Sequence, residues 1–290
     1  MKVVIGKYAG FCPGVLNSVN KANEVIENDN DIYCLGELIH NKTVVSSLED
    51  KGMKTIEDIN DVPNGKTVLF RAHGVKKSIY EEAKNKNLNV IDLTCAIVKN
   101  IHEKVNEAKK DSFIIITGDN THPETIGTKD FAGDNSYVIS VEEDVEIAYK
   151  EFINSNLNKI YVISQTTFSL KKFDELVLLI KDRFKNYDID INNSICKATE
   201  LRQKEVEELS KDVDSVIVVG GKNSSNTKKL YDISTRNCDL VFHIEKVDEL
   251  NIKDFESCKK VAVVAGASTP KDIINEVEFF LDRVSNSSLI

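Results

Sequence analysis

The amino-acid sequence predicts an α/β protein with mostly parallel sheets. Short apolar runs rich in β-branched residues recur along the whole chain, and amphipathic stretches with helical periodicity lie between most of them. Alternation of strand and helix is typical of βαβ units, whose strands pair in parallel. A weak internal repeat, described below, further predicts three similar α/β domains.

Many of the predicted strands are apolar at consecutive positions, as expected for strands covered by helices on both faces. In chain order they are residues 2–6, 32–38, 67–72, 89–94, 112–118, 136–140, 159–165, 189–195, 215–221, 240–244 and 260–266. The clearest amphipathic stretches between and after them predict helices at residues 15–27, 96–110, 171–185, 198–211, 228–234 and 271–283.

Length and charge limit the class of protein. A chain of 290 residues has room for about two or three domains. Its 38 Lys and Arg against 47 Asp and Glu give a net charge of −9, which disfavours attraction to a phosphate backbone. The apolar runs are too short for a secretory or membrane-spanning segment. We therefore expect a cytoplasmic protein with no nucleic-acid or membrane partner.

Six cysteines are scattered singly, without a CxxC pair. Cys12, Cys95 and Cys196 each follow a predicted strand and precede a predicted helix, which suggests repeats of roughly 80 to 100 residues. The expected domains are residues 14–95, residues 96–192, and residues 1–13 together with 193–290.

A helix N-terminus favours a thiolate, which suits these three cysteines to metal binding. Taken singly, a cysteine at a strand end is more often a small buried apolar residue. The spacing fits either zinc or an iron–sulfur cluster, and three ligands leave one metal position open. The other cysteines, Cys34, Cys238 and Cys258, are assigned to packing or to the surface.

Polar side chains at the carboxyl ends of predicted strands form a set of hydrogen-bond donors suited to a compact dianion such as a diphosphate. They are His40, His73, His122, Ser224, Ser225, Asn226 and Ser268. The alternatives are histidines with purely structural roles and serines that cap helices, as Ser268 before Pro270 suggests. Capping and anion binding use the same helix end and are compatible.

Glu124 and Thr166 offer a carboxylic acid and a hydroxyl for proton delivery. A glutamate in the first turn of a helix is also explained by the helix dipole alone.

Three other functional motifs are incomplete or absent. Residues 220–223 read GGKN and lack the Ser or Thr of a P-loop, and residues 102–106 read HEKVN and lack the second histidine of HExxH. The first predicted strand is not followed by GxGxxG, so a Rossmann dinucleotide site is unsupported.

The sequence resembles the LytB/IspH family along nearly its whole length. The motifs that carry the resemblance occur in order at residues 10–12 (GFC), 40–41 (HN), 72–75 (AHGV), 94–95 (TC), 122–124 (HPE), 165–167 (QTT), 196–199 (CKAT), 202–203 (RQ), 223–227 (NSSNT) and 266–270 (GASTP). Family departures occur at Arg71, Thr121 and Ala96, and none removes an expected ligand. Arg71 is interpreted as pairing with a carboxylate; added charge near a diphosphate is the alternative.

The resemblance implies an oxidoreductase of the non-mevalonate isoprenoid pathway. It implies a trefoil-like fold with pseudo-threefold symmetry around a 4Fe–4S cluster on Cys12, Cys95 and Cys196. The substrate, 4-hydroxy-3-methylbut-2-enyl diphosphate, would lose its allylic hydroxyl to give isopentenyl and dimethylallyl diphosphates. The histidines, serines and Asn226 named above would hold the diphosphate, Thr166 would contact the hydroxyl end, and Glu124 would deliver protons. A ferredoxin or flavodoxin is the implied electron donor.

Two alternatives from other classes use the same cysteines. A non-catalytic iron–sulfur sensor or regulator would need no diphosphate site. A zinc hydrolase that uses cysteines and histidines would give colourless protein.

Overall fold

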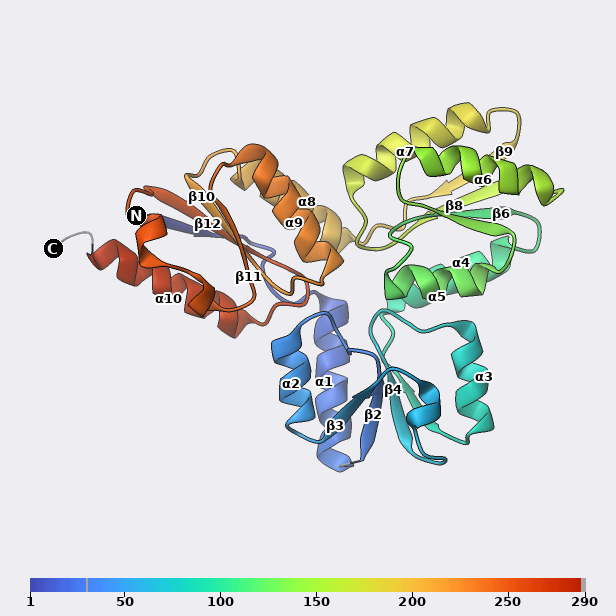
Figure 1. Ribbon diagram of the computed structural model, residues 1–290, viewed down its shortest axis with the longest axis horizontal. Coiled ribbons are helices and arrows are strands. Elements are labelled where there is room, and N and C mark those ends of the chain that lie inside the picture. Colours follow the sequence, from blue (N-terminus) through green and yellow to red (C-terminus); the bar gives the residue numbers. More distant parts are fainter. Residues whose placement is uncertain (30, 288–290) are drawn as a thin grey trace. The chain divides into compact units, whose positions relative to one another are not determined.

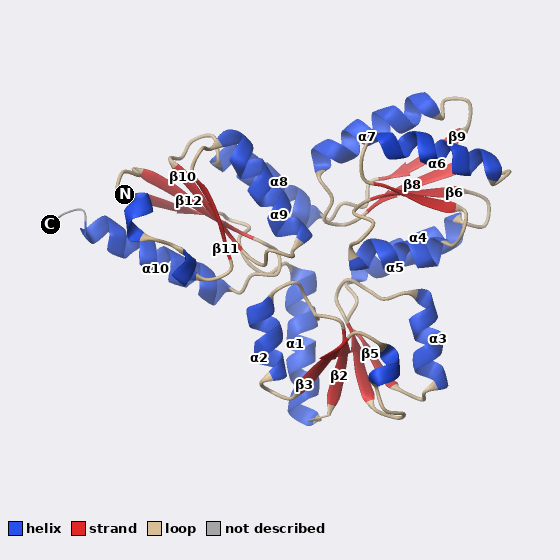
Figure 2. Ribbon diagram, viewed as in Figure 1, coloured by secondary structure: helices blue, strands red, loops and turns tan. Residues whose placement is uncertain are grey.

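The computed structural model describes residues 1–29 and 31–287. Their strands form three four-stranded sheets in which every pairing is parallel (Figures 1 and 2). The chain separates into two compact units. One comprises residues 1–16, 39–46 and the described chain from residue 197 onward; the other comprises residues 17–38 and 47–196.

The second unit holds two of the sheets. The first has the strand order β3 (Met53–Ile56), β2 (Ile32–Leu35), β4 (Thr67–Phe70), β5 (Asn89–Asp92). Helix α1 (Pro13–Asn28), most of which belongs to this unit, lies beside one face, and α3 (Lys77–Asn85) lies beside the other (Figure 1). Helix α2 (Lys42–Glu49) is divided between the two units. A 3-10 turn, η1 (Ile59–Asp61), packs with Val68 and Phe70 in the core under α3.

The other sheet of this unit has the order β7 (Ser136–Ile139), β6 (Phe113–Thr117), β8 (Lys159–Ser164), β9 (Asp188–Asn192). Alternate residues of β6 enter opposite cores, as strand geometry requires. Phe113 and Ile115 pack toward α6 (Glu143–Asn154) and α7 (Leu170–Arg183), whereas Ile114 and Ile116 pack toward α4 (Ala96–Ala108) and α5 (Pro123–Ala132). This burial on both faces explains why residues 113–116 of β6 are all apolar.

The third sheet lies in the unit that contains both ends of the described chain. Its order is β1 (Lys2–Ile5), β12 (Lys260–Ala265), β10 (Ser215–Val219), β11 (Val241–Ile244). Helices α8 (Lys197–Leu209) and α9 (Ser225–Asn237) cover one face. On the other face lie α10 (Lys271–Ser287) and the 3-10 turns η2 (Val247–Glu249) and η3 (Ile252–Phe255).

The three sheets share one topology. In each, the strand that precedes a cysteine is an edge strand, namely β5, β9 or β1, and its neighbour is β4, β8 or β12. The predicted α/β class with three similar sheets is confirmed. The division at residues 14–95, 96–192 and 1–13 plus 193–290 stays a prediction, and its residues 30 and 288–290 lie outside the described chain. No helix among the described residues combines the length and apolar character needed to cross a membrane.

Candidate functional site

Cys12, Cys95 and Cys196 have the same backbone setting. Each is the residue immediately before a helix, α1, α4 or α8 respectively. The backbone N–H of each donates a 3.0 Å hydrogen bond to a carbonyl in the loop after the neighbouring strand, from Cys12 to Ala267, from Cys95 to Ala72 and from Cys196 to Thr166. The repeat inferred from sequence therefore corresponds to a repeated structural position.

Burial separates these cysteines from the other three. Cys12, Cys95 and Cys196 are half-buried, whereas Cys34, Cys238 and Cys258 are buried. Burial raises the pKa of the Cys34 thiol to about 12 and also raises the pKa of Cys258. The assignment of these three cysteines to packing is consistent with this burial.

The half-buried set fits thiolate ligands. A helix N-terminus presents unpaired N–H groups and a partial positive charge, both of which stabilise a thiolate. At Cys12 the sulfur already accepts a hydrogen bond, from the backbone N–H of Val15 at 3.4 Å. Within residues 1–29 and 31–287, no cysteine is engaged in a disulfide.

Glu124 and Thr166 form a buried pair. The Thr166 N–H donates to Oε1 of Glu124 and the Thr166 hydroxyl contacts Oε2, both at 2.6 Å. The Glu124 residue is only 1% exposed, so dipole complementation at a solvated helix end does not describe it. Burial raises the pKa of Glu124 to about 7, against the opposing effect of the two Thr166 hydrogen bonds. This carboxyl can therefore hold and release a proton near neutral pH.

Gln165 braces this pair, and sequence reasoning gave it no role. Its Oε1 accepts hydrogen bonds from the hydroxyl of Thr125 at 3.2 Å and the backbone N–H of Asp119 at 2.9 Å. Its Nε2 donates to the hydroxyl of Thr167 at 2.7 Å. One side chain thus ties the residues flanking Glu124 and Thr166 to the loop before α5. Its place in the QTT motif at a strand end was the available signal.

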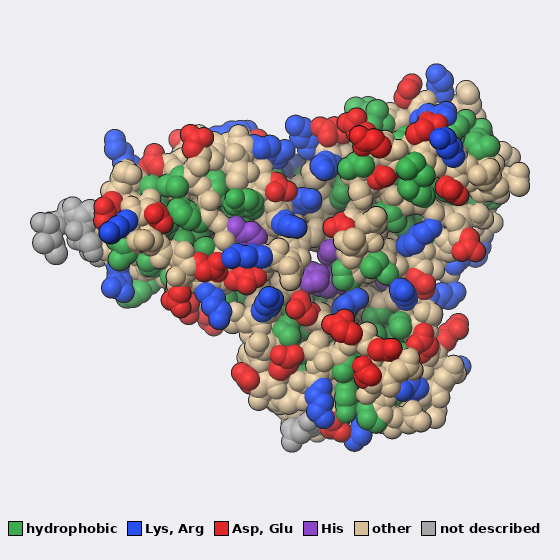
Figure 3. Space-filling model, in the orientation of Figure 1, with side chains coloured by type: hydrophobic (Ala, Val, Ile, Leu, Met, Phe, Trp, Pro, Cys, Tyr) green, Lys and Arg blue, Asp and Glu red, His purple; other side chains and the backbone are tan. Residues whose placement is uncertain are grey.

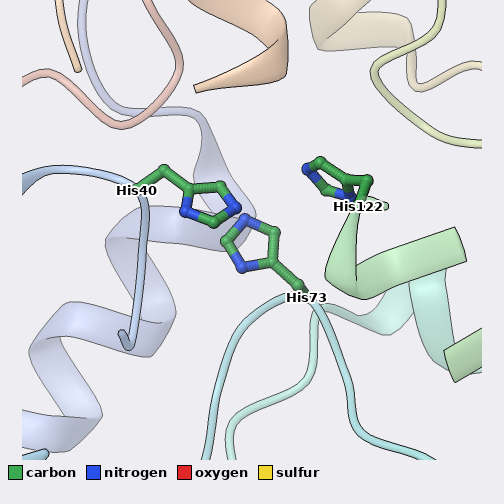
Figure 4. A group of neighbouring side chains, drawn as sticks. All are labelled: His40, His73 and His122. Carbon is green, nitrogen blue, oxygen red and sulfur yellow. The ribbon is translucent and has the colours of Figure 1, made fainter. Parts of the chain in front are cut away.

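His122 caps α5. Its Nδ1 accepts a 3.2 Å hydrogen bond from the backbone N–H of Glu124. The neutral imidazole must then carry its hydrogen on Nε2, which makes that atom a donor for an anion. The ring of His73, in the loop after β4, contacts the His122 ring edge to face with centroids 5.4 Å apart (Figure 4). Two predicted site residues of this unit therefore lie together.

His40 and Ser268 meet in the other unit. The Ser268 hydroxyl donates to the backbone carbonyl of His40 at 3.1 Å, and His40 lies in the segment between β2 and α2 (Figure 4). Helix α10 begins at Lys271, three residues after Ser268. The hydrogen bond that the Ser268 hydroxyl donates goes to the segment that contains His40.

The N-terminus of α9 brings together Ser224, Ser225 and Asn226. The Ser224 hydroxyl oxygen caps the helix by accepting a 3.3 Å hydrogen bond from the Thr227 N–H. Asn226 is 3% exposed, yet its side-chain amide nitrogen and oxygen have no hydrogen-bond partner among the described residues. An unpaired buried amide costs stability, so it points to a ligand that completes its hydrogen bonds.

Arg71, the family departure, supports the His73 loop. Its Nε donates to the backbone carbonyl of Gly74 at 3.4 Å. The carboxylates of Glu57 and Glu37 act on the guanidinium at longer range. The hydrogen-bond partner of Arg71 is thus the Gly74 carbonyl oxygen of this loop, whereas the sequence suggested pairing with a carboxylate.

Figure 3 shows how charged side chains are distributed over one face of the molecule. On the face drawn in Figure 3, Lys and Arg side chains are interspersed with Asp and Glu side chains over both units.

These features describe a class of protein: a parallel α/β protein in which three cysteines precede helices at equivalent positions and one glutamate side chain is buried. The family profile described as LytB protein matches residues 3–282. The chain belongs to the LytB family, whose members are iron–sulfur enzymes.

Curated relatives carry one enzyme name. The chain is 41% identical to the 4-hydroxy-3-methylbut-2-enyl diphosphate reductase of Clostridioides difficile (strain 630), over 98% of this chain and 100% of the relative. It is 42% identical to the enzyme of the same name from Clostridium perfringens (strain SM101 / Type A), over 95% and 96% of the two chains.

Solved structures agree. The E-1-hydroxy-2-methyl-but-2-enyl-4-diphosphate reductase of Plasmodium falciparum matches with a TM-score of 0.88 and 32% identity, over 97% of this chain and 87% of the other. A structure of (E)-4-hydroxy-3-methyl-but-2-enyl diphosphate reductase, described as the terminal enzyme of the non-mevalonate pathway, matches with a TM-score of 0.70 and 35% identity, over 98% and 100%.

Proposed function

We propose that this protein is a 4-hydroxy-3-methylbut-2-enyl diphosphate reductase of the non-mevalonate isoprenoid pathway. The reaction takes up two electrons and two protons, breaks the allylic C–O bond, and releases water with isopentenyl or dimethylallyl diphosphate. The observation that carries the proposal is the repeated placement of Cys12, Cys95 and Cys196 before helices in a member of the LytB family.

The proposed cofactor is one 4Fe–4S cluster held by these three cysteines, with its fourth iron open to substrate. When bound, such a cluster supplies electrons and a Lewis-acidic iron for the leaving oxygen. The chain contributes helix N-termini that favour the thiolate form of each ligand. The N–H to Sγ contact at Cys12 supports this role because it stabilises negative charge on sulfur.

The polar side chains have separate proposed roles. The diphosphate contacts are assigned to His40, His73, His122, Ser224, Ser225, Asn226 and Ser268. Anchoring the diphosphate would fix the position of the hydroxyl at the other end of the substrate. We assign contact with that hydroxyl to Thr166 and proton delivery to Glu124. The Thr166 hydroxyl lies 2.6 Å from Oε2 of Glu124, which links the two side chains. Protonation matters because hydroxide is a poor leaving group.

We further propose a ferredoxin or flavodoxin as electron donor and the bacterial cytoplasm as the site of action. The two curated relatives cited above come from bacteria, and thiols that ligate a metal must stay reduced. No direct interaction with nucleic acid or membrane is part of the proposal.

The proposal is tested with protein purified without oxygen. We expect brown protein containing about four irons per chain, a visible spectrum that changes when the hydroxylated diphosphate is added, and both five-carbon diphosphates after reduction. A visible spectrum that does not change when substrate is added would indicate an iron–sulfur sensor. Colourless protein that contains zinc would indicate a hydrolase. Either result would overturn the reductase assignment.

Asn226→Leu tests the anion site through opposite effects on stability and binding. Removing the unpaired buried amide is expected to raise the free energy of unfolding by about 1 kcal/mol and to weaken inhibition by inorganic diphosphate at least about tenfold. The control is Asn237→Leu on the same helix. The Asn237 amide donates to Ser210 and to the Ile233 carbonyl, so this change should destabilise the protein and leave inhibition intact. Unchanged inhibition in Asn226→Leu would remove Asn226 from the site.

A further inference from the structure

His102 lies in α4 and belongs to neither the cysteine set nor the anion site. Its residue is 4% exposed, and its Nε2 has no hydrogen-bond partner among the described residues. In sequence it begins the incomplete motif HEKVN. Burial lowers the pKa of His102 to about 4, so the ring is neutral at physiological pH. A neutral buried histidine outside the site needs a reason for its position.

One edge of the ring touches the loop that carries His73. Gly74 adopts φ +79°, and a Cβ placed there would lie 2.8 Å from Cε1 of His102. Only glycine accommodates both the backbone conformation and this close approach. The imidazole therefore sits directly against the backbone next to His73. Arg71 holds the same residue through its bond to the Gly74 carbonyl.

The other side of the ring touches α5, the helix that His122 caps and whose first turn contains Glu124. The His102 ring stacks on Phe131 with centroids 4.2 Å apart and planes inclined by 15°. A Cβ placed on Gly127 would lie 3.6 Å from Nε2 of His102 and 3.3 Å from the Val75 carbonyl oxygen. The helix thus approaches the His73 loop closely, and the imidazole fills the space between them.

We propose that His102 is a positioning residue that locks the His73 loop against α5. Its ring holds α5 at Gly127 and Phe131. It thereby sets the spacing between His73 and His122 and the position of the helix that bears Glu124. The structural part of this inference stands on packing within one unit. Its effect on diphosphate binding and turnover rests on the proposed function.

The central test compares His102→Ala with Ile101→Ala. Ile101 is 3% exposed on the same helix but packs into the core beneath β6, so its variant reports general destabilisation. For His102→Ala we expect faster hydrogen exchange at Gly74, Val75 and the first turn of α5, with iron content retained. We also expect the affinity for inorganic diphosphate, measured by inhibition, and kcat to fall about tenfold each. Small misplacements of binding groups are costly. Ile101→Ala should lower the melting temperature without these local changes.

Two further variants keep the test decisive if His102→Ala folds poorly. His102→Phe retains a ring that can stack on Phe131 and should restore most of the diphosphate affinity. Gly127→Ala favours the helical backbone but places a Cβ 3.3 Å from the Val75 carbonyl oxygen. It should therefore push α5 away from the His73 loop and weaken inhibition by inorganic diphosphate while preserving stability.

The outcomes separate this inference from the proposed function. Exchange and inhibition in His102→Ala that match Ile101→Ala would overturn the positioning role, whatever the activity. Wild-type protein that lacks reductase activity would overturn the proposed function. If that inactive protein still shows the local exchange changes in His102→Ala, the positioning role is supported.

Discussion

Cys95→Ser is expected to abolish turnover and remove most of the iron and visible absorbance. Serine is a poor ligand for iron in such clusters because the soft thiolate is lost. Cys95 shares its setting with Cys12 and Cys196, half-buried before a helix with its N–H bonded across to the adjacent loop. We therefore expect the same result for Cys12→Ser and Cys196→Ser, measured by iron and sulfide content and by product formation.

Cys238→Ser is the matched control. The Cys238 sulfur lies 3.6 to 3.8 Å from three backbone carbonyl oxygens, those of Val213, Asp214 and Leu240. A serine hydroxyl in its place has acceptors at hand, so the protein should fold, bind its cluster and turn over normally. Turnover retained in Cys95→Ser, or lost equally in Cys238→Ser, would contradict the assignment of the cluster ligands.

The strands that sequence predicted best are those buried on both faces. The run FIIIT of β6 is apolar at every central position because helices cover both sides of the sheet. The edge strand β3 was missed. Its four residues, MKTI, have one buried, one exposed and two half-buried positions, so no apolar run marks it.

Helix α5 illustrates why periodicity misses a functional element. Its buried residues are Glu124, Thr125, Gly127, Thr128 and Ala132, and most of them are polar or small. An inward face built for chemistry and for close packing has no apolar stripe, so the usual helical signal is lost. Helices α2, α3 and α6 were also absent from the predicted set.

The sequence could select candidate site residues, because ligands in parallel α/β sheets bind at the carboxyl ends of strands. The sequence could not assign the Nε2–H tautomer of His122 or the bracing by Gln165. These depend on which backbone N–H or side chain faces each atom after loops from different strands meet. From the sequence, His102 was considered only as the first residue of an incomplete HExxH motif, because its contacts with Gly74, Gly127 and Phe131 join segments far apart in the sequence.

Glu124→Gln is expected to retain iron content and substrate affinity while kcat falls by about 10² to 10⁴. The amide is nearly isosteric, and its oxygen can still accept from the Thr166 N–H that now bonds to Oε1. It has no proton to release to the departing hydroxyl. In the wild type, kcat should fall as pH rises through about 7, where the buried carboxyl loses its proton, and this limb should be missing from the residual activity of the variant.

Stability gives an independent measure of the same proton. The pKa of Glu124 is raised from 4.5 to about 7, so its stabilisation is fully present below pH 4.5 and is lost as pH rises through 7. Glutamine does not titrate. Relative to wild type, Glu124→Gln should therefore gain about 3 kcal/mol in the free energy of unfolding between pH 4 and pH 9.

Glu146→Gln provides the control of opposite sign. Glu146 is in the first turn of α6, and its pKa is lowered by the Arg183 side chain that bonds to it at 2.7 Å. Because the folded state favours ionised Glu146, the stability that this pair gives the wild type rises with pH. The free energy of unfolding of Glu146→Gln should therefore fall slightly relative to the wild type as pH rises, and only slightly because the site is exposed. Normal turnover in Glu124→Gln would exclude proton delivery by Glu124. A pH-independent stability difference would show that the carboxyl is ionised in the folded protein, because burial then fails to hold the proton.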